Sequence, residues 1–395
     1  MSRPTLAEID LEALRFNLGQ LFKLTGDKAE VLAVVKANAY GHGAPEVSRE
    51  LESAGASIFG VATTEEGIEL RLGGVTSSIL VLAGTYPEEF DRIVANRLTP
   101  VIYDLDIARA FHSRAEKERG RLSVHLKIDT GMSRLGIPWR RWEEALEVLG
   151  ALKMLPVEGL MSHFSAAEGE GVEDRAFTEE QLSRFTRCLD LARKKGMNPR
   201  YLHLANSAAA ALRESARFNL VRSGLMLYGY HPSPALRGLV HLMPVLRWKT
   251  AILSLKKVPK GDPVSYGRTF HCAGESLIAV LPVGYADGYS RRLSNRGEVL
   301  IRGRRAKIAG IVCMDLTMVD VSEIPGVKAG DEVVLLGKQG EDEISAVEMA
   351  GWVESIPYEV LCGIGKRVPR VYRKGRGEST LRHVPDEVPK AQLKR

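Results

Sequence analysis

The sequence of 395 residues contains few cysteines and no long apolar run. Its four cysteines lie far apart, without the spacing of a metal site or of a disulfide framework. No stretch is long and apolar enough for a transmembrane helix, and the opening "MSRPTLAEID" lacks the apolar core of a signal peptide. These absences predict a protein of the reducing cytoplasm, with no metal site and no membrane partner.

The body of the chain also lacks an excess of positive charge. The net charge is +6, but residues 366–395 alone carry ten Lys or Arg against three acidic residues, so the remainder is close to neutral. No basic stripe with interleaved aromatic residues occurs in the body, so we exclude nucleic acid as the main partner. The basic tail, residues 374–395, has no apolar periodicity and is predicted to be disordered.

Short apolar runs rich in β-branched residues recur through the first part of the chain, separated by longer amphipathic segments. One of these segments begins at Thr63 and Glu66, a pair typical of a helix N-terminus. Eight strands that alternate with helices predict a (β/α)8 barrel of the TIM type. The eight runs are 31–37, 58–63, 78–84, 99–104, 123–129, 156–164, 201–207 and 219–224.

After residue 240 the pattern changes to closely spaced strands with little helix between them, as in "LRWKTAILSLKKV" and "DEVVLLG". We therefore predict an α/β chain of two domains. Residues 1–238 form the barrel, residues 239–373 form a mainly β domain, and residues 374–395 form the tail.

Polar residues stand where the predicted barrel strands end. The chemistry of such barrels takes place at the C-terminal ends of their strands, so several polar strand ends indicate a site. Each residue alone has a simpler explanation, for example a lysine whose stem covers apolar surface at the end of a strand. The residues are Lys36, Lys127, Asp129, His163, His203, Asn206, Ser207, Arg222 and Gly224.

A lysine and an arginine at neighbouring strand ends suit pyridoxal 5'-phosphate. This cofactor needs a Schiff-base lysine, a partner for its ring nitrogen and a cradle for its phosphate. Lys36 and Arg222 are candidates for the first two, and loops after the late strands often bind phosphate. Because an arginine keeps its proton, Arg222 would leave the ring nitrogen unprotonated. That favours rapid removal and return of a Cα proton over transamination.

Several long motifs in both predicted domains resemble those of alanine racemases. The resemblance covers residues 3–373, in order. It implies pyridoxal phosphate, a homodimer with shared active sites, and production of D-alanine for peptidoglycan synthesis. The motifs are "AVVKANAYGHGA", "LKIDTGMSRLG", "HLANSAAAL", "VRSGLMLYG", "PVSYGRTF", "PVGYADGYSRRLSNRGEVLIRG", "IVCMDLTMVDV" and "IPYEVLCGIGKRVPR".

The resemblance also implies roles for individual residues. Lys36 is the Schiff-base lysine and one catalytic base, and Tyr266 of the partner subunit is the opposite base. Arg134 meets the cofactor and the substrate carboxylate, which the backbone N–H of Met314 also binds. His163 lies beside the ring, and Arg222 meets the ring nitrogen. The phosphate contacts are Tyr40, Ser207, Gly224, Leu225 and Tyr358, and the supporting residues are His203, Tyr285, Arg291 and Asp315.

Lys127 raises a problem of charge, because a plain lysine beside Arg134 would place two cations together. In the family the matching lysine is often carboxylated by carbon dioxide and then holds the arginine. We expect the same modification of Lys127.

Three related activities remain as alternatives. Pyridoxal phosphate homeostasis proteins share the barrel and the lysine but lack a second domain, so Tyr266 and Met314 disfavour them. Two-domain amino-acid decarboxylases place an acidic group at the ring nitrogen, where Arg222 is expected here. A racemase of broader or different amino-acid specificity is the nearest alternative.

Overall fold

The structure is a computed structural model that describes residues 3–375 and 378–381. The described chain divides into two compact units. One consists of residues 14–39 and 44–242, and the other consists of residues 3–13, 40–43 and the described residues from 243 onward.

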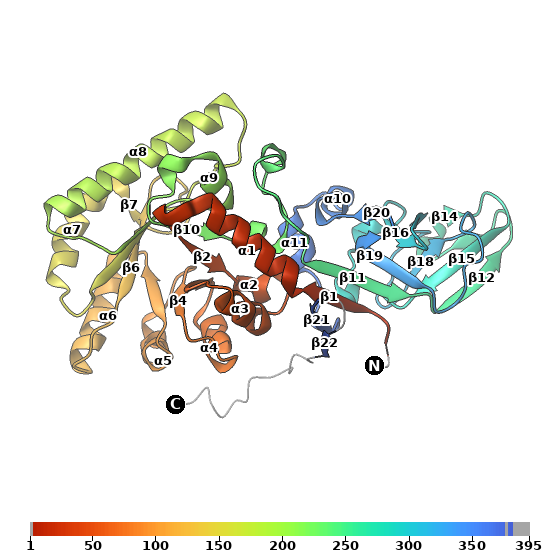
Figure 1. Ribbon diagram of the computed structural model, residues 1–395, viewed down its shortest axis with the longest axis horizontal. Coiled ribbons are helices and arrows are strands. Elements are labelled where there is room, and N and C mark those ends of the chain that lie inside the picture. Colours follow the sequence, from red (N-terminus) through yellow and green to blue (C-terminus); the bar gives the residue numbers. More distant parts are fainter. Residues whose placement is uncertain (1–2, 376–377, 382–395) are drawn as a thin grey trace. The chain divides into compact units, whose positions relative to one another are not determined.

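The first unit is a barrel of eight parallel strands, as the sequence predicts (Figure 1). The sheet runs from β10 through β2 to β9. Its two ends are joined by backbone hydrogen bonds, from Asn219 N to Leu202 O (3.4 Å) and from Arg222 N to Ala205 O (3.0 Å). The strands are β2 (Glu30–Val34), β3 (Ile58–Val61), β4 (Ser78–Val81), β5 (Thr99–Ile102), β6 (Val124–Asp129), β8 (Val157–Met161), β9 (Tyr201–His203) and β10 (Leu220–Ser223), with β7 (Ile137–Pro138) beside β6.

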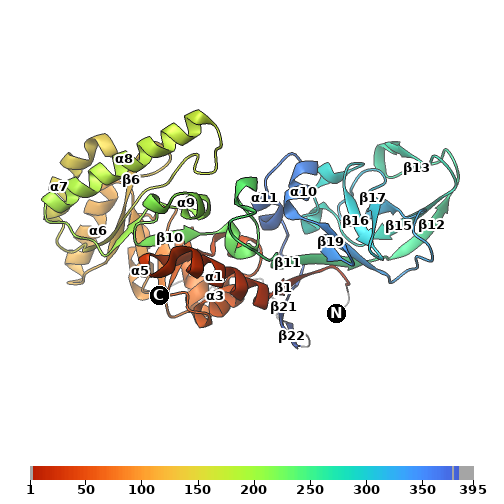
Figure 2. The ribbon, with the colours of Figure 1, turned by 45° about the horizontal axis from the view of Figure 1, so that its top comes forward.

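Helices follow the barrel strands and surround them, as Figure 2 shows for α6, α7 and α8. Local sequence sets where they begin: the Asp104 side chain accepts from the backbone N–H of Asp106 at the start of α6, and Thr63 accepts from Glu66 at the start of α4. The helices are α1 (Leu11–Thr25), α3 (Ala44–Ser53), α4 (Thr64–Leu72), α5 (Phe90–Ala95), α6 (Leu105–Lys117), α7 (Trp142–Ala151), α8 (Val172–Lys194) and α9 (Ser207–Leu212).

The second unit is mainly β, which also agrees with the sequence. Its largest sheet has the order β17-β16-β19-β11-β1-β21-β22, and β20 pairs with β19. Smaller sheets contain β12-β15-β18 and β13-β14, and two helices complete the unit, α10 (Ala346–Trp352) and α11 (Pro357–Cys362). The strands are β1 (Leu6–Asp10), β11 (Leu246–Ala251), β12 (Ser254–Val258), β13 (Pro263–Val264), β14 (Phe270–His271), β15 (Ser276–Leu281), β16 (Glu298–Ile301), β17 (Arg304–Lys307), β18 (Thr317–Asp320), β19 (Glu332–Gln339), β20 (Asp342–Ile344), β21 (Arg370–Lys374) and β22 (Glu378–Leu381).

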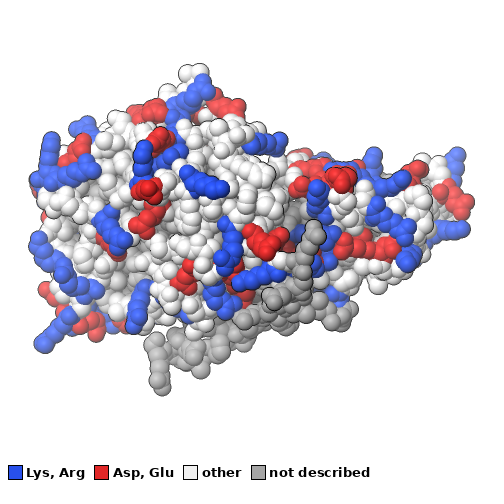
Figure 3. All heavy atoms as spheres, in the orientation of Figure 1, with Lys and Arg blue, Asp and Glu red and all other residues white. Residues whose placement is uncertain are grey.

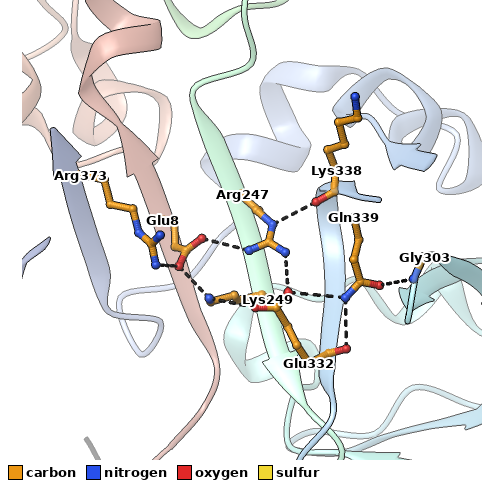
Figure 4. Close-up of polar contacts among 8 residues, drawn as sticks. All are labelled: Glu8, Arg247, Lys249, Gly303, Glu332, Lys338, Gln339 and Arg373. Atoms are coloured by element: carbon orange, nitrogen blue, oxygen red, sulfur yellow. Dashed lines mark hydrogen bonds and ion pairs between the residues drawn. The ribbon is translucent and has the colours of Figure 1, made fainter. Parts of the chain in front are cut away.

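Strand β1 comes from the start of the chain but lies between β11 and β21 (Figure 1). A network of charged side chains holds it there (Figure 4). The buried carboxylate of Glu8 accepts from Arg247 (3.1 Å), Lys249 (2.7 Å) and Arg373, while Glu332 on β19 accepts from Arg247 (2.5 Å) and Lys249 (3.0 Å). Each carboxylate contacts at least two of the three cations, and each cation contacts at least one carboxylate. Every charge in the network therefore has an opposite partner.

The domain boundaries given above stay a prediction. Most of the tail predicted to be disordered lies outside the described residues, and the part of it that is described includes β22, which pairs antiparallel with β21. None of the helices that the described residues form has the length and apolar character needed to cross a bilayer. On the face that Figure 3 shows, Lys and Arg side chains are interspersed with Asp and Glu.

Candidate active site

Lys36 stands just past the end of β2 and opens a turn of unusual backbone conformation. Four consecutive non-glycine residues, Ala37 to Tyr40, have φ between 51° and 54°, in the left-handed region. L-residues enter that region at a cost of about 1–2 kcal/mol each. Local strain of this size persists only where surrounding contacts impose it, and it is typical of functional sites.

Two side chains impose this turn. Glu66 on α4 accepts hydrogen bonds from the backbone N–H of Ala37 (2.6 Å) and of Ala62 (2.6 Å). Asn38 accepts from the backbone N–H of Ala44 (2.8 Å). Glu66 therefore joins the residue after Lys36 to the end of β3, and so fixes the point from which the lysine side chain departs.

Arg222 on β10 is buried inside the barrel, and its two amino groups are held by fixed acceptors. Nη1 donates to Nδ1 (3.2 Å) and to the backbone oxygen (2.9 Å) of His203. Nη2 donates to Nδ1 of His163 (2.9 Å) and to the backbone oxygens of Ser162 (2.8 Å) and Leu204 (3.1 Å). Among the described residues none accepts from Nε, so this N–H is the donor left for a ligand.

Three further cationic side chains, Lys36, Lys127 and Arg134, are close enough to this arginine for their charges to interact in the same cluster. Burial first, and then the charges of Arg134, Arg222 and Lys36, lower the pKa of Lys127 from 10.5 to about 8, although Asp129 opposes the shift. Burial and the same set of charges lower the pKa of His163 well below its usual value, so this imidazole is neutral. Burial and Arg134 likewise lower the pKa of Arg222 to about 9, which leaves the guanidinium charged at neutral pH.

The end of β9 and the end of β10 meet at a small polar cluster. The backbone N–H of Gly224 donates to Oγ of Ser207 (3.0 Å), and this oxygen lies 3.4 Å from Oγ of Ser223. Leu225 is buried where the chain turns after Gly224. Hydroxyl and backbone N–H groups thus converge where the sequence predicts a phosphate contact.

These features of the barrel fit pyridoxal phosphate. Burying several cations together is unfavourable unless anions neutralise them. The cofactor phosphate and a substrate carboxylate would provide such anions, and the ring nitrogen would accept from Nε of Arg222.

The other phosphate candidates lie in the second unit. The rings of Tyr40 and Tyr358 have their centroids 5.8 Å apart and tilted by 45°. Burial, together with Tyr358 and Cys362, raises the pKa of the Tyr40 hydroxyl, which therefore remains protonated and able to donate. The two tyrosines form one cluster, as expected for residues that share a ligand.

Tyr266 begins a short 3₁₀ turn (Tyr266–Arg268) and is 71% exposed. Ser265, just before it, has a φ of 68°, and its hydroxyl donates to the backbone oxygen of Ile311 (2.7 Å). A Cβ at Gly310 would lie 2.6 Å from Cβ of Ser265, so only glycine leaves room for this turn. Tyr266 is thus presented to solvent by a fixed backbone.

The remaining candidates lie on two loops that are joined to each other. The backbone N–H of Tyr285 donates to the oxygen of Cys313 and that of Ala286 to the oxygen of Met314, both at 3.0 Å. Met314 is exposed, and Asp315 accepts from Arg367 (2.8 Å). Arg291 begins the 3₁₀ turn Arg291–Leu293 and has an exposed side chain.

The sequence analysis missed a buried glutamine that ties two site loops together. Gln181 on α8 donates to Oγ1 of Thr130 (3.3 Å) and to the backbone oxygen of His163 (3.1 Å). Its carbonyl oxygen accepts from the backbone N–H (3.0 Å) and hydroxyl (3.1 Å) of Ser165. Nothing in the local pattern of α8 marks Gln181, except that a glutamine occupies a buried helix position.

Comparison with known proteins identifies the family. A model described as alanine racemase, N-terminal domain, matches residues 9–232, and one described as alanine racemase, C-terminal domain, matches residues 245–372. The chain belongs to the alanine racemase family. The resemblance expected from the motifs is therefore confirmed, as is the enzyme class, a racemase of a pyridoxal-phosphate-dependent family.

Relatives of the family match nearly the whole chain. An alanine racemase of Geobacter sulfurreducens is 46% identical over 94% of this chain and 97% of its own length. One of Carboxydothermus hydrogenoformans is 47% identical over 94% of this chain and its full length. The solved alanine racemase of Clostridium difficile 630 has a TM-score of 0.90 at 36% identity and covers 96% of this chain and 98% of its own. That of Bacillus anthracis with bound L-Ala-P has a TM-score of 0.89 at 33% identity, covering 96% and 97%.

Proposed function

We propose that this protein interconverts L-alanine and D-alanine with bound pyridoxal phosphate, using one base on each face of the substrate. The observation that carries the proposal is the pairing of a lysine on a constrained turn with a buried arginine that keeps one N–H for a ligand. Membership of the alanine racemase family supports alanine as the substrate. The product D-alanine would supply peptidoglycan synthesis in the cytoplasm.

We further propose which residues bind the cofactor. Pyridoxal phosphate would supply the electron sink that makes the substrate Cα proton removable. Lys36 would hold it covalently, and Arg222 would donate to its ring nitrogen through Nε. The phosphate would bind to Tyr40, Ser207, Gly224, Leu225 and Tyr358.

Arg222 limits how far the site stabilises negative charge at Cα. Its guanidinium is charged at neutral pH even though burial lowers its pKa to about 9. It would therefore donate a hydrogen bond to the ring nitrogen and keep the proton. Such a site favours quick return of the Cα proton, and this suits racemisation better than transamination.

Substrate orientation falls to Arg134 and to the backbone N–H of Met314, which would both bind the carboxylate. Lys127 influences this step through Arg134. As a carbamate it would be an anion that holds the guanidinium, whereas as an ammonium it would repel it. We therefore propose that Lys127 is carboxylated.

Lys36 and Tyr266 would act as the two bases, since racemisation requires a proton to leave one face and arrive at the other. A tyrosine with an ordinary pKa of about 10 needs help to accept a proton near neutrality. His163 is suited to help, because its Nδ1 accepts from Arg222 and its proton therefore lies on Nε2. An Nε2–H donor directed at the phenolate oxygen would stabilise the negative charge that Tyr266 needs to act as a base.

A homodimer would complete the site, with Tyr266 and Met314 reaching the partner's cofactor. Both side chains are largely exposed on a single chain, at 71% and 53%. This exposure leaves both side chains accessible to a partner chain.

A racemisation assay on the purified protein tests the proposal. We expect interconversion of the alanine enantiomers, visible absorbance from bound cofactor, and borohydride attachment of that cofactor to Lys36. Lys36→Ala should abolish all three, whereas Lys117→Ala, at an exposed position on α6, should change none. A panel of other amino acids tests a racemase of different specificity. Absence of any racemisation, or full activity in Lys36→Ala, would contradict the assignment.

A further inference from the structure

Four side chains inside the barrel form one continuous series of hydrogen bonds. His125 on β6 contacts His203 on β9, with Nδ1 and Nε2 separated by 2.8 Å. His203 contacts Arg222, and Arg222 contacts His163. His125 lies two residues before Lys127 on the same strand, so both side chains point to the same face of the sheet.

The charge on Arg222 shows where the imidazole protons lie in this series. Arg222 can only donate, so Nδ1 of His203 must present a lone pair, and its proton is on Nε2. Nε2–H of His203 then points at Nδ1 of His125, which must also accept, so the proton of His125 is on its own Nε2. The reverse arrangement would place an N–H of His203 against an N–H of Arg222.

Burial keeps both rings neutral, as this series requires. It lowers the pKa of His125 to about 3, with a further contribution from the charge of Arg222. It also lowers the pKa of His203 well below the usual value, with contributions from His125 and Arg222. Both histidines therefore remain neutral at every pH at which the enzyme would work.

The structure makes room for His125 and leaves one of its groups unsatisfied. A Cβ at Gly159 would lie 2.2 Å from Nδ1 of His125, so a side chain there would displace the ring. Nε2 of His125 is buried and has no hydrogen-bond partner among the described residues. A buried N–H without a partner is unfavourable, and an apolar residue would avoid it. What an apolar residue would lose is the acceptor at Nδ1.

We propose that His125 is a positioning residue for the ring-nitrogen donor: by accepting the Nε2 proton of His203 it fixes the tautomer in which His203 holds Arg222. With Nη1 and Nη2 fixed, Nε is the N–H of Arg222 directed at the ligand. His125 touches neither cofactor nor substrate and acts through His203. The inference rests on the proposed function only for the identity of the group that Nε meets.

Nitrogen NMR of the purified protein reads the tautomers directly. The protein is labelled with ¹⁵N in its nine histidines, and signals are assigned from His125→Asn and His203→Asn variants. Long-range ¹H–¹⁵N correlations should show both His125 and His203 as the single Nε2–H tautomer, unchanged between pH 6 and 8. Finding His203 as the Nδ1–H form, or as a mixture, overturns the proposal. The tautomers are read on the wild-type protein, and the variants serve only to assign its signals.

Two substitutions of His125 distinguish the effect of losing its hydrogen-bond acceptor from the effect of changing the volume of its side chain. His125→Leu removes the acceptor, and we expect His203 to lose its single tautomer and kcat to fall about 10-fold, with little change in KM. His125→Asn offers an amide oxygen near the position of Nδ1 and should keep the tautomer and most of kcat. Tyr201→Leu is the control for packing, because Tyr201 stacks on His125 at 5.8 Å without a hydrogen bond to it.

Two results with these variants would contradict the positioning role proposed for His125. Equal loss of kcat in His125→Leu and His125→Asn would reduce its role to packing, and an unchanged tautomer in His125→Leu would show that His203 needs no acceptor. The tautomers are measured on the protein whether or not it racemises alanine. Failure of the proposed function would appear in the racemisation assay and leave the NMR result standing.

Discussion

Lys127 carries its amine in surroundings that disfavour the charged form. With a pKa of about 8, roughly one-tenth of the amine is neutral at pH 7, and only the neutral amine can react with carbon dioxide. Carboxylation would replace a repelled cation by an anion beside Arg134. We expect Lys127→Ala to lose activity and to regain part of it in acetate, since acetate restores an anion, but not in chloride at equal ionic strength. Equal activity in both salts would contradict this role.

The stability of the folded protein also reports on Lys127. An unmodified Lys127 would lose its proton near pH 8 in the folded protein but near pH 10.5 in the unfolded chain. The free energy of unfolding would then rise across this range, because the unfolded state binds the additional proton. A carboxylated Lys127 would lose its carboxyl group as bicarbonate when the chain unfolds and would take up the same proton, so the pH dependence is the same for both forms. Only the carboxylated form releases bicarbonate. We therefore expect bicarbonate, added at constant pH and ionic strength, to raise the free energy of urea unfolding of the wild type but not of Lys127→Met. No effect of bicarbonate would indicate a free amine.

The two proposed bases should act on opposite enantiomers. Tyr266→Phe keeps Lys36, so we expect it still to exchange the α-hydrogen of D-alanine with deuterium. Exchange in L-alanine and net interconversion should fall by roughly 10²–10⁴-fold, the usual cost of losing a general base. NMR of α-deuteration, started separately from each enantiomer, measures both. Equal exchange from the two enantiomers would rule out Tyr266 as the second base.

The turn after β2 is a strained element that fixes the position of one side chain, that of Lys36. Glu66 accepts from two backbone N–H groups at 2.6 Å, one of them in this turn. Glu66→Ala leaves both without their acceptor, and we expect a loss of about 1–3 kcal/mol in the free energy of unfolding. Activity should fall more than in Glu65→Ala, where the neighbouring, exposed carboxylate pairs with Arg92 at the surface. Denaturant unfolding measures the loss of stability in both variants, and racemisation assays measure the loss of activity.

The elements themselves were largely predictable. All eight barrel strands were located from apolar runs, and parallel pairing then places Lys36, Lys127, His163 and Arg222 at one end. The sequence does not mark the left-handed turn, because Ala37 and Ala39 have no preference for it and the distant Glu66 imposes it. Strand β1 was missed as well, since its partners β11 and β21 lie more than 230 residues away. Contacts of such range leave no periodic signal.

The hydrogen-bond series from His125 to His163 shows a different limit of prediction. His203 was expected to support Arg222, because a family motif includes it. The pairing of His125 with His203 depends on the register of β6, β8 and β9, and on Gly159 leaving space for the ring. A single sequence does not specify that register.

For the whole molecule, the proposed mechanism requires two chains, because the base on one side belongs to the partner. Tyr266 and Met314 are held by rigid backbone on the second unit, where both are largely exposed. An isolated chain would present these side chains to water without a substrate to contact. The activity should therefore depend on protein concentration at dilutions where the dimer dissociates.

Mixing two inactive variants tests the shared site. Lys36→Ala lacks the residue proposed to hold the cofactor, and Tyr266→Phe lacks the proposed opposite base. A heterodimer would contain one site with both defects and one site with neither, so we expect random mixing to restore about one quarter of the wild-type activity, since half of the dimers are mixed and each has one intact site. Subunit exchange is followed by native mass spectrometry of chains labelled with different isotopes. If mixed dimers form and remain inactive, Lys36 and Tyr266 of different chains do not share a site, and each chain must complete its own.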